Sequence, residues 1–207
     1  MAERGLRARL TGAVLALGLL ASACSSSSDA GDGELSAVDI TKTAYQVPAV
    51  SLDATTGESF SLTESTEKPL TLVFFGYVNC PDICKMVMSN IASALTRVDE
   101  KVRDDVQVVF VTTDPARDDR QALAGYLGRF DPTFVGLTGE IEPLREAAEG
   151  FHVAWQKGKK LPGGGYDVTH GTQIFLVDGE DKVPYFWKQD TSAAVLAEDL
   201  TLLVKES

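Results

Sequence analysis

Continuous apolar runs alternate with helical periodicity along the middle of the chain. Residues 71–78 form a continuous apolar run and residues 106–113 a mainly apolar one, which is typical of strands buried on both faces and indicates central, parallel strands. Between them, apolar side chains follow the three–four spacing of an amphipathic helix: Val87, Met88, Ile91, Leu95 and Val98. The pattern then predicts a helix over 118–130, a short strand over 134–137 and a short helix over 140–150.

The flanking segments complete the fold prediction. A hairpin is expected over 50–62 with its turn at 53–57, residues 151–155 alternate like a strand, and a closing helix is expected over 192–205. Strands at 172–177 and 183–187 form a hairpin pair, and Pro184 favours an edge position for the second. This order predicts an α/β, thioredoxin-like fold: a mixed central sheet flanked by helices, with an added hairpin before the His170 loop.

The first residues have the layout of an export signal. Arg4, Arg7 and Arg9 precede an apolar stretch at 10–21, and small residues lead to Cys24. This ending resembles the lipobox of bacterial lipoproteins, in which the cysteine is lipidated, although Ala21 stands where leucine is usual. Ordinary secretion with cleavage near Ala23 is the alternative. We therefore predict a signal peptide at 1–23, a lipid-anchored flexible tether at 24–44 and one domain at 45–207, on the outer face of the cell membrane.

The net charge limits the classes of partner that the protein can bind. The formal net charge is −11, and removal of the leader would take away three arginines and one glutamate. A strongly acidic chain argues against nucleic acid as a partner. After residue 24 no stretch is long and apolar enough to span a membrane, so membrane contact would depend on the lipid anchor.

Cys80 and Cys84 carry the most distinctive chemistry. They flank three residues at a predicted strand-to-helix junction, where the helix dipole favours thiolate. A structural disulfide closing so small a loop would add little stability, so a redox pair or two ligands of a metal site are the better interpretations.

His170 favours the metal interpretation. Thioredoxins place a proline before the strand that faces their dithiol, whereas the segment before residue 172 here contains His170 and no proline. Two thiolates and one imidazole form a soft set of three ligands that suits Cu(I). Structural zinc would require a fourth protein ligand, and the sequence offers no obvious one.

Four ordered motifs resemble the Sco/SenC family: FFGYVNCPDIC, TDPARD at 113–118, GLTG at 136–139 and YDVTH at 166–170. The resemblance implies a membrane-tethered copper protein that binds one copper, as Cu(I) or Cu(II), through Cys80, Cys84 and His170. It also implies that the protein delivers copper to, or matures, the copper-bearing subunit of cytochrome c oxidase. Other copper chaperones or thiol reductants are implied as further partners. Val78-Asn79 and Lys85 depart from the residues common in the family, without removing a ligand.

Other residues invite plainer interpretations. We expect His152 to be a half-exposed strand residue rather than a ligand, and both Met86 and Met88 to pack in the core. Asp82 is expected to tune the thiols or to cap the helix. Residues 114–118 are expected to form a turn and a helix start, outside the ligand set.

Three functions remain open from the sequence. The main hypothesis is a copper chaperone for cytochrome c oxidase. The rival is an enzyme, a thiol–disulfide oxidoreductase that uses Cys80 and Cys84 as its redox-active pair, and the weakest is a copper or redox sensor.

Overall fold

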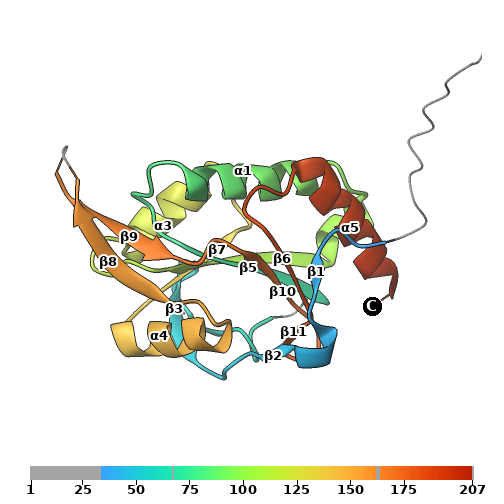
Figure 1. Cartoon of the computed structure of the whole chain (residues 1–207), viewed down its shortest axis with the longest axis horizontal. Helices are drawn as coiled ribbons and strands as arrows, with labels where there is room; N and C mark the ends of the chain where they lie inside the picture. Colours follow the sequence, from blue (N-terminus) through green and yellow to red (C-terminus); the bar gives the residue numbers. More distant parts are fainter. Residues whose placement is uncertain (1–33, 67, 162–163, 207) are drawn as a thin grey trace, which may run out of the picture. The chain divides into compact units, whose positions relative to one another are not determined.

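An eight-stranded mixed sheet forms the centre of the protein (Figure 1). The computed structural model describes residues 34–66, 68–161 and 164–206. In spatial order the sheet contains β1 (Val38–Asp39), β12 (Tyr185–Trp187), β10 (Ile174–Val177), β5 (Leu70–Gly76), β6 (Val106–Thr112), β7 (Val135–Thr138), β3 (Ser51–Ala54) and β4 (Ser59–Ser61).

The two longest strands occupy the middle of this sheet. β5 and β6 pair in parallel over their full length, from Leu70 opposite Val106 to Gly76 opposite Thr112. β7 continues the parallel pairing, whereas β10 runs antiparallel to β5. Helices cover both faces of these strands, which explains why their sequences are apolar at successive positions.

Helices cover the two faces unequally. The helices are α1 (Ile83–Leu95), α2 (Glu100–Asp104), α3 (Arg120–Leu127), α4 (Ile141–Gly150) and α5 (Ala193–Glu206), with a short 3-10 helix, η1, at Thr41–Thr43. Figure 1 shows α1, α3 and α5 above the sheet and α4 below it. The first group packs on Leu72, Phe74 and Phe110, and α4 packs on the alternate residues Val73 and Phe75. These observations confirm the thioredoxin-like α/β prediction.

In the part of the chain that the structure describes, four strands lie outside the main sheet. β8 (Trp155–Lys160) and β9 (Tyr166–His170) form an antiparallel hairpin that projects from the body of the domain (Figure 1). β2 (Tyr45–Gln46) pairs with β11 (Lys182–Val183) in a separate ribbon. The predicted extra hairpin is therefore present, and His170 is the last residue of its second strand rather than part of a following loop.

Residues 151–155 are not a strand, contrary to the prediction. α4 ends at Gly150, and His152 adopts a left-handed backbone conformation with φ of 54° while its amide donates to the carbonyl oxygen of Glu149. This turn buries Phe151 and Val153 and exposes His152 between them. A helix-terminating turn thus produced the same alternation as a strand, and β8 begins only at Trp155.

The edge position predicted from Pro184 is also wrong. β12 lies between β1 and β10, so it has a neighbour on each side. Pro184 stands between β11 and β12, where the strand is interrupted, and its carbonyl oxygen accepts a bond from the amide of Ile40. A proline at a break between strands removes no sheet hydrogen bond, which is why an inner strand tolerates it.

The predictions for the N-terminal segment fall only partly on described residues. The predicted signal peptide and Cys24 lie outside the described residues. Part of the predicted tether at 24–44 is described, and there β1 pairs with β12. The boundaries of leader, tether and domain remain predictions. Within the described ranges no helix has the length and apolar character needed to cross a membrane.

The two methionines of α1 provide a direct test of the packing. Met88 is completely buried, whereas Met86 is 40% exposed, so the expectation that both pack in the core is wrong for Met86. Met88→Ala should lower the free energy of unfolding by about 2–5 kcal/mol, because it leaves a cavity in the core. Met86→Ala should change it by no more than about 0.5 kcal/mol. Chemical denaturation of the reduced, metal-free protein measures both, and equal losses would contradict this packing.

Candidate metal centre

Three chain segments bring Cys80, Cys84 and His170 together at the carboxyl end of β5. Cys80 lies in the loop after β5, Cys84 lies in the first turn of α1, and His170 ends β9. Cys84 is completely buried, Cys80 is 6% exposed, and His170 is half-buried. The site therefore sits at the margin of the core, with its imidazole nearest to solvent.

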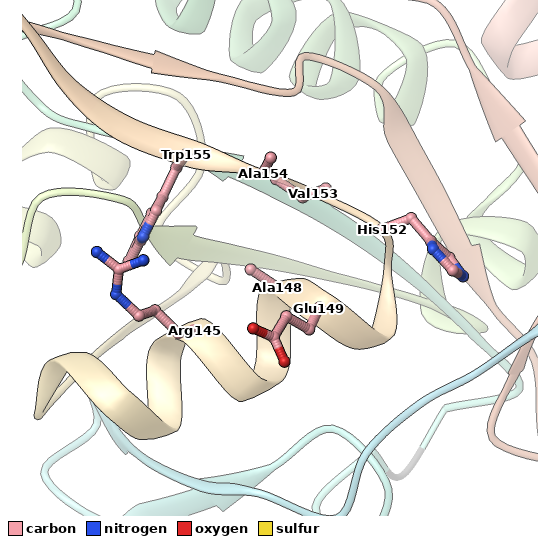
Figure 2. Close-up of a pocket in the computed structure, with 7 residues that line it drawn as sticks. All are labelled: Arg145, Ala148, Glu149, His152, Val153, Ala154 and Trp155. Carbon is pink, nitrogen blue, oxygen red and sulfur yellow. The ribbon is translucent and has the colours of Figure 1, made fainter.

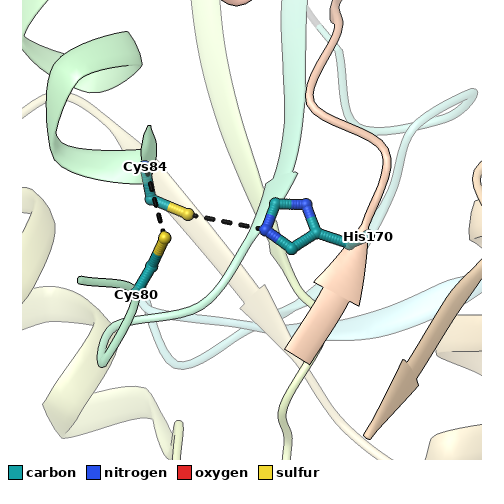
Figure 3. Close-up of side chains that lie close together, drawn as sticks. All are labelled: Cys80, Cys84 and His170. Carbon is teal, nitrogen blue, oxygen red and sulfur yellow. Dashed lines mark hydrogen bonds between the residues drawn. The ribbon is translucent and has the colours of Figure 1, made fainter. Parts of the chain in front are cut away.

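The three ligand atoms converge on one point (Figure 3). All lie within 4.8 Å of one another, and Cys84 Sγ is 3.7 Å from His170 Nε2. The backbone amide of Cys84 donates to Cys80 Sγ at 3.4 Å. Both cysteines are free thiols. The side chains predicted from the sequence thus form one cluster; their role as ligands remains a prediction.

The imidazole of His170 presents a free lone pair to the two sulfurs. Its Nδ1 lies 2.6 Å from the carbonyl oxygen of Gly171. A carbonyl oxygen can only accept, so Nδ1 must carry the proton and Nε2 is left as the unprotonated nitrogen. A backbone carbonyl in this position is a common way of orienting a metal-binding histidine.

The two thiols share a proton unequally. The pKa of Cys80 is held well below its usual range, chiefly because the Cys84 thiol donates a hydrogen bond to it, with further bonds from the backbone amides of Cys84 and Asp82. The pKa of Cys84 is raised by the same bond and by burial. Cys80 is therefore the thiolate of the pair at neutral pH, ready to bind a soft metal or to attack a disulfide.

A gap in the core makes room for the sulfur of Cys84. A Cβ atom built on Gly76 would lie 2.9 Å from Cys84 Sγ and 2.9 Å from Phe74 Cε1. Such distances are too short for real contacts, so glycine is required at this end of β5. Phe74 and Tyr77 then meet the His170 ring edge-on, with centroids 6.3 and 5.7 Å away.

This donor set fits a soft ion of low coordination number. Two sulfurs and one imidazole nitrogen suit Cu(I), whereas a hard cation such as Mg²⁺ would require oxygen ligands. Among the described residues, the cluster contains no fourth histidine, cysteine or carboxylate ligand. The arrangement thus has the donor chemistry of a three-ligand copper site.

Asp118 is a buried residue for which the sequence predicted only a place in a turn before a helix. Its Oδ2 accepts bonds from the Val78 amide at 3.0 Å and from Thr112 Oγ1 at 2.8 Å. Burial raises the pKa of this carboxyl to about 6, although those two hydrogen bonds oppose the shift. Asp118 thereby ties the loop that contains Cys80 to the end of β6.

Asp82 and His152 take positions that differ in part from the sequence interpretation. Asp82 precedes α1 at the cap position, but its side chain makes no capping hydrogen bond. The His152 ring contacts the ring of Tyr45 at a tilt of 57°, with centroids 4.3 Å apart. His152 also lines a cavity of about 360 Å³ with Arg145, Glu149 and Trp155 (Figure 2). The cluster of possible metal ligands does not include it.

Comparison with known proteins identifies the family. The sequence profile of SCO1/SenC matches residues 39–205. The chain belongs to the SCO1/SenC family. This match covers most of the described residues, including all three members of the cluster.

Curated relatives in this family are longer proteins. Protein sco1 of Schizosaccharomyces pombe is 36% identical over 125 residues, which are 59% of this chain and 48% of that protein. The human mitochondrial SCO1 homolog is 30% identical over 157 residues, covering 70% of this chain and 52% of that protein. The chain thus spans about half the length of these relatives.

Solved structures of the family share the fold. Apo Sco1 of Thermus thermophilus has a TM-score of 0.72 and 27% identity, covering 84% of this chain and 99% of that one. Yeast Sco1 with copper bound has a TM-score of 0.71 and 26% identity, with coverages of 79% and 90%. Copper-bound ScoI of Arabidopsis thaliana has a TM-score of 0.69 and 26% identity, with coverages of 77% and 98%.

The shared proton makes a prediction about thiol reactivity. Because the pKa of Cys80 is lowered, its thiolate persists as the pH falls. The rate of alkylation of Cys80 by iodoacetamide should therefore fall by less than about threefold from pH 8 to pH 6. An ordinary thiol with a pKa of about 8.5 would slow by about two orders of magnitude. Mass spectrometry resolves the two cysteines in the reduced, metal-free protein.

The control for this measurement is Cys84→Ala. It removes the thiol that donates to Cys80 Sγ, so the alkylation rate at Cys80 should become steeply dependent on pH. A steep profile already in the unaltered protein would show that Cys80 is not the thiolate.

Proposed function

We propose that this protein is an extracytoplasmic copper chaperone that binds one copper ion through Cys80, Cys84 and His170. The convergence of two thiols and an unprotonated imidazole nitrogen within 4.8 Å is the observation that carries the proposal. Membership of the SCO1/SenC family supports it, as do the copper-bound structures of the yeast and Arabidopsis relatives.

The oxidation state of the thiols controls this function. Only reduced cysteines provide two separate sulfur ligands, and Cu(I) is the ion best matched to them, with Cu(II) as a second state. Each binding event displaces protons from the site, because metals bind thiolates rather than thiols. The third ligand, His170, comes from the β8–β9 hairpin.

The recipient in this proposal is the copper-bearing subunit of cytochrome c oxidase. The family resemblance supports this assignment. A set of three protein ligands also leaves a coordination position of the ion unfilled, so an incoming thiolate could bind before the resident ligands leave. Transfer would then proceed by exchange of ligands, without the copper ever being free in solution. Other copper chaperones or thiol reductants would load copper or reduce the cysteines.

A copper titration with two histidine variants tests the site. The reduced protein should bind one Cu(I) per chain. His170→Asn should weaken binding by more than the roughly 10- to 100-fold that follows loss of an outer-shell partner of a metal ligand. His152→Asn is the matched control, because asparagine tolerates the left-handed conformation found there and His152 lies outside the cluster.

Competition with a chelator of known Cu(I) affinity measures the Cu(I) dissociation constant of each protein. Equal affinities in the three proteins would refute the three-ligand site, and absence of stoichiometric binding would refute the chaperone.

A thiol–disulfide oxidoreductase is the second candidate function. The lowered pKa of Cys80 favours it, since a thiolate beside a second thiol can attack a substrate disulfide and then be released by that second thiol. The substrate would be an oxidised pair of cysteines on an oxidase subunit or another exported protein. Fast disulfide exchange with negligible copper binding would favour this enzyme over the chaperone.

Membrane attachment through Cys24 completes the proposal. The support is the basic, apolar and small-residue order that precedes Cys24 in the sequence. Mass spectrometry of the mature protein from its native host should find an N-terminal, lipid-modified Cys24. An unmodified terminus elsewhere would rule out the anchor.

A further inference from the structure

Among the described residues, the hairpin that contains His170 has no strand pairing with the main sheet. There β8 and β9 pair with each other, and residues 171–173 separate His170 from β10. The position of the imidazole beside the thiols therefore depends on the short connection to β10 and on side chains that hold the hairpin against the domain.

Tyr77 makes the first of these contacts. It follows β5, three residues before Cys80, and its hydroxyl donates to Asp167 Oδ1 at 2.5 Å. The amide of Val168 points at both groups, 2.9 Å from Asp167 Oδ1 and 3.4 Å from the Tyr77 hydroxyl. The ring of Tyr77 also stands perpendicular to that of His170. One side chain thus contacts the imidazole and anchors the strand that contains it.

Arg117 and Asp114 make the second contact, from the segment after β6. The guanidinium of Arg117 lies 3.8 Å above the centroid of the Tyr166 ring and donates to the Tyr166 carbonyl oxygen at 3.1 Å. Asp114 accepts from Arg117 Nε and, through its other oxygen, from the Tyr166 hydroxyl at 2.6 Å. Tyr166, the first residue of β9, is therefore held through its ring, its hydroxyl and its backbone carbonyl.

Both halves of the metal site are attached to the same short segment. Residues 114–118 hold the hairpin through Asp114 and Arg117, and they hold the cysteine loop through the bond from the Val78 amide to Asp118. Asp114 is 4% exposed and Asp118 is completely buried, so water competes little for these bonds.

We propose that Tyr77, Asp114 and Arg117 are positioning residues that hold Tyr166 and Asp167, and so place His170 within reach of the two thiols. These five residues are called the hairpin latch. The inference rests on the proposed copper site, whose third ligand it explains. Loosening the latch should leave a site with two sulfur ligands and an imidazole that is bound only part of the time.

Tyr77→Phe is the sharpest test, because it removes one hydroxyl and keeps the ring against His170. The matched control is Tyr126→Phe, which also removes a buried hydroxyl near the thiols, but one without a hydrogen-bond partner in the described part of the chain. Both substitutions delete the same atom, so a difference between them reports the bond to Asp167.

Hydrogen exchange of the metal-free protein gives the first measurement. In Tyr77→Phe the amides of β8 and β9, Val168 above all, should exchange at least about tenfold faster, as expected when a bond to a charged group is lost. The amides of β5 and β6 should keep their rates, and Tyr126→Phe should match the unaltered protein throughout. Equal acceleration across all strands would mean a general loss of stability and would overturn the latch.

Copper binding gives the second measurement, in a double-mutant cycle with His170→Asn. Tyr77→Phe should raise the Cu(I) dissociation constant about tenfold when His170 is present and should leave it unchanged when residue 170 is Asn, because the latch acts through the imidazole. The Cu(II) form of Tyr77→Phe should also show weakened nitrogen hyperfine coupling in its electron paramagnetic resonance spectrum.

Arg117 provides a second variant on the other side of the latch. Arg117→Ala should accelerate exchange in the hairpin as Tyr77→Phe does, and Arg117→Lys should restore part of the protection through its charge beside Asp114. Lysine lacks the planar fork that both stacks on Tyr166 and bonds its carbonyl, so the rescue should be incomplete.

These experiments distinguish failure of the proposed copper site from failure of the proposed latch. If the unaltered protein binds no copper, the proposed function is wrong, and hydrogen exchange still decides whether the latch holds the hairpin. If the unaltered protein binds copper through His170 but Tyr77→Phe matches Tyr126→Phe in exchange and affinity, the latch is wrong and the copper site stands.

Discussion

The parallel pairing of β5 with β6 decides where the chemistry of this protein can lie. Because parallel strands end at the same edge of a sheet, the loop after Gly76 and the loop after Thr112 emerge side by side. One loop contains Cys80 and leads into α1, and the other contains Asp114 and Asp118. The bond from the Val78 amide to the buried carboxylate of Asp118 joins the two loops directly. The cysteine loop and Asp118 therefore lie together at the carboxyl ends of β5 and β6, where β9 brings His170.

The donor atoms are prepared for a metal before one arrives. Hydrogen bonds to Cys80 favour its thiolate, and the carbonyl oxygen of Gly171 selects the tautomer of His170 that leaves Nε2 unprotonated. Such preparation lowers the free energy that binding must otherwise spend on removing protons and orienting side chains. The same preparation suits thiol exchange at Cys80, which is why one site supports both candidate functions.

Local patterns in the sequence predicted the central strands and α1 well, because periodicity reports burial directly. They misassigned residues 151–155, where a left-handed turn at His152 buries alternate residues as a strand would. The cysteine pair could be recognised by its spacing, and His170 by its place before the strand at 172–177, where thioredoxins have a proline; the family resemblance then supported the same three residues. Tyr77, Asp114 and Arg117 were missed because their partners lie 49 to 90 residues away along the chain, beyond the reach of any local pattern. The family motifs were the signal that pointed to them, because Tyr77 lies in FFGYVNCPDIC and the other two lie in TDPARD.

Gly76 has a consequence for how this site could change over evolution. The sulfur of Cys84 occupies the space that a side chain at position 76 would fill, between Phe74 and Phe110. The hydrophobic core and the ligand set therefore share one volume, and a side chain at position 76 would meet a ligand and two core rings at once. A lineage that abandoned the cysteine would still have to move Phe74 and Phe110 before alanine could stand at position 76, so the glycine is expected to outlast the cysteine.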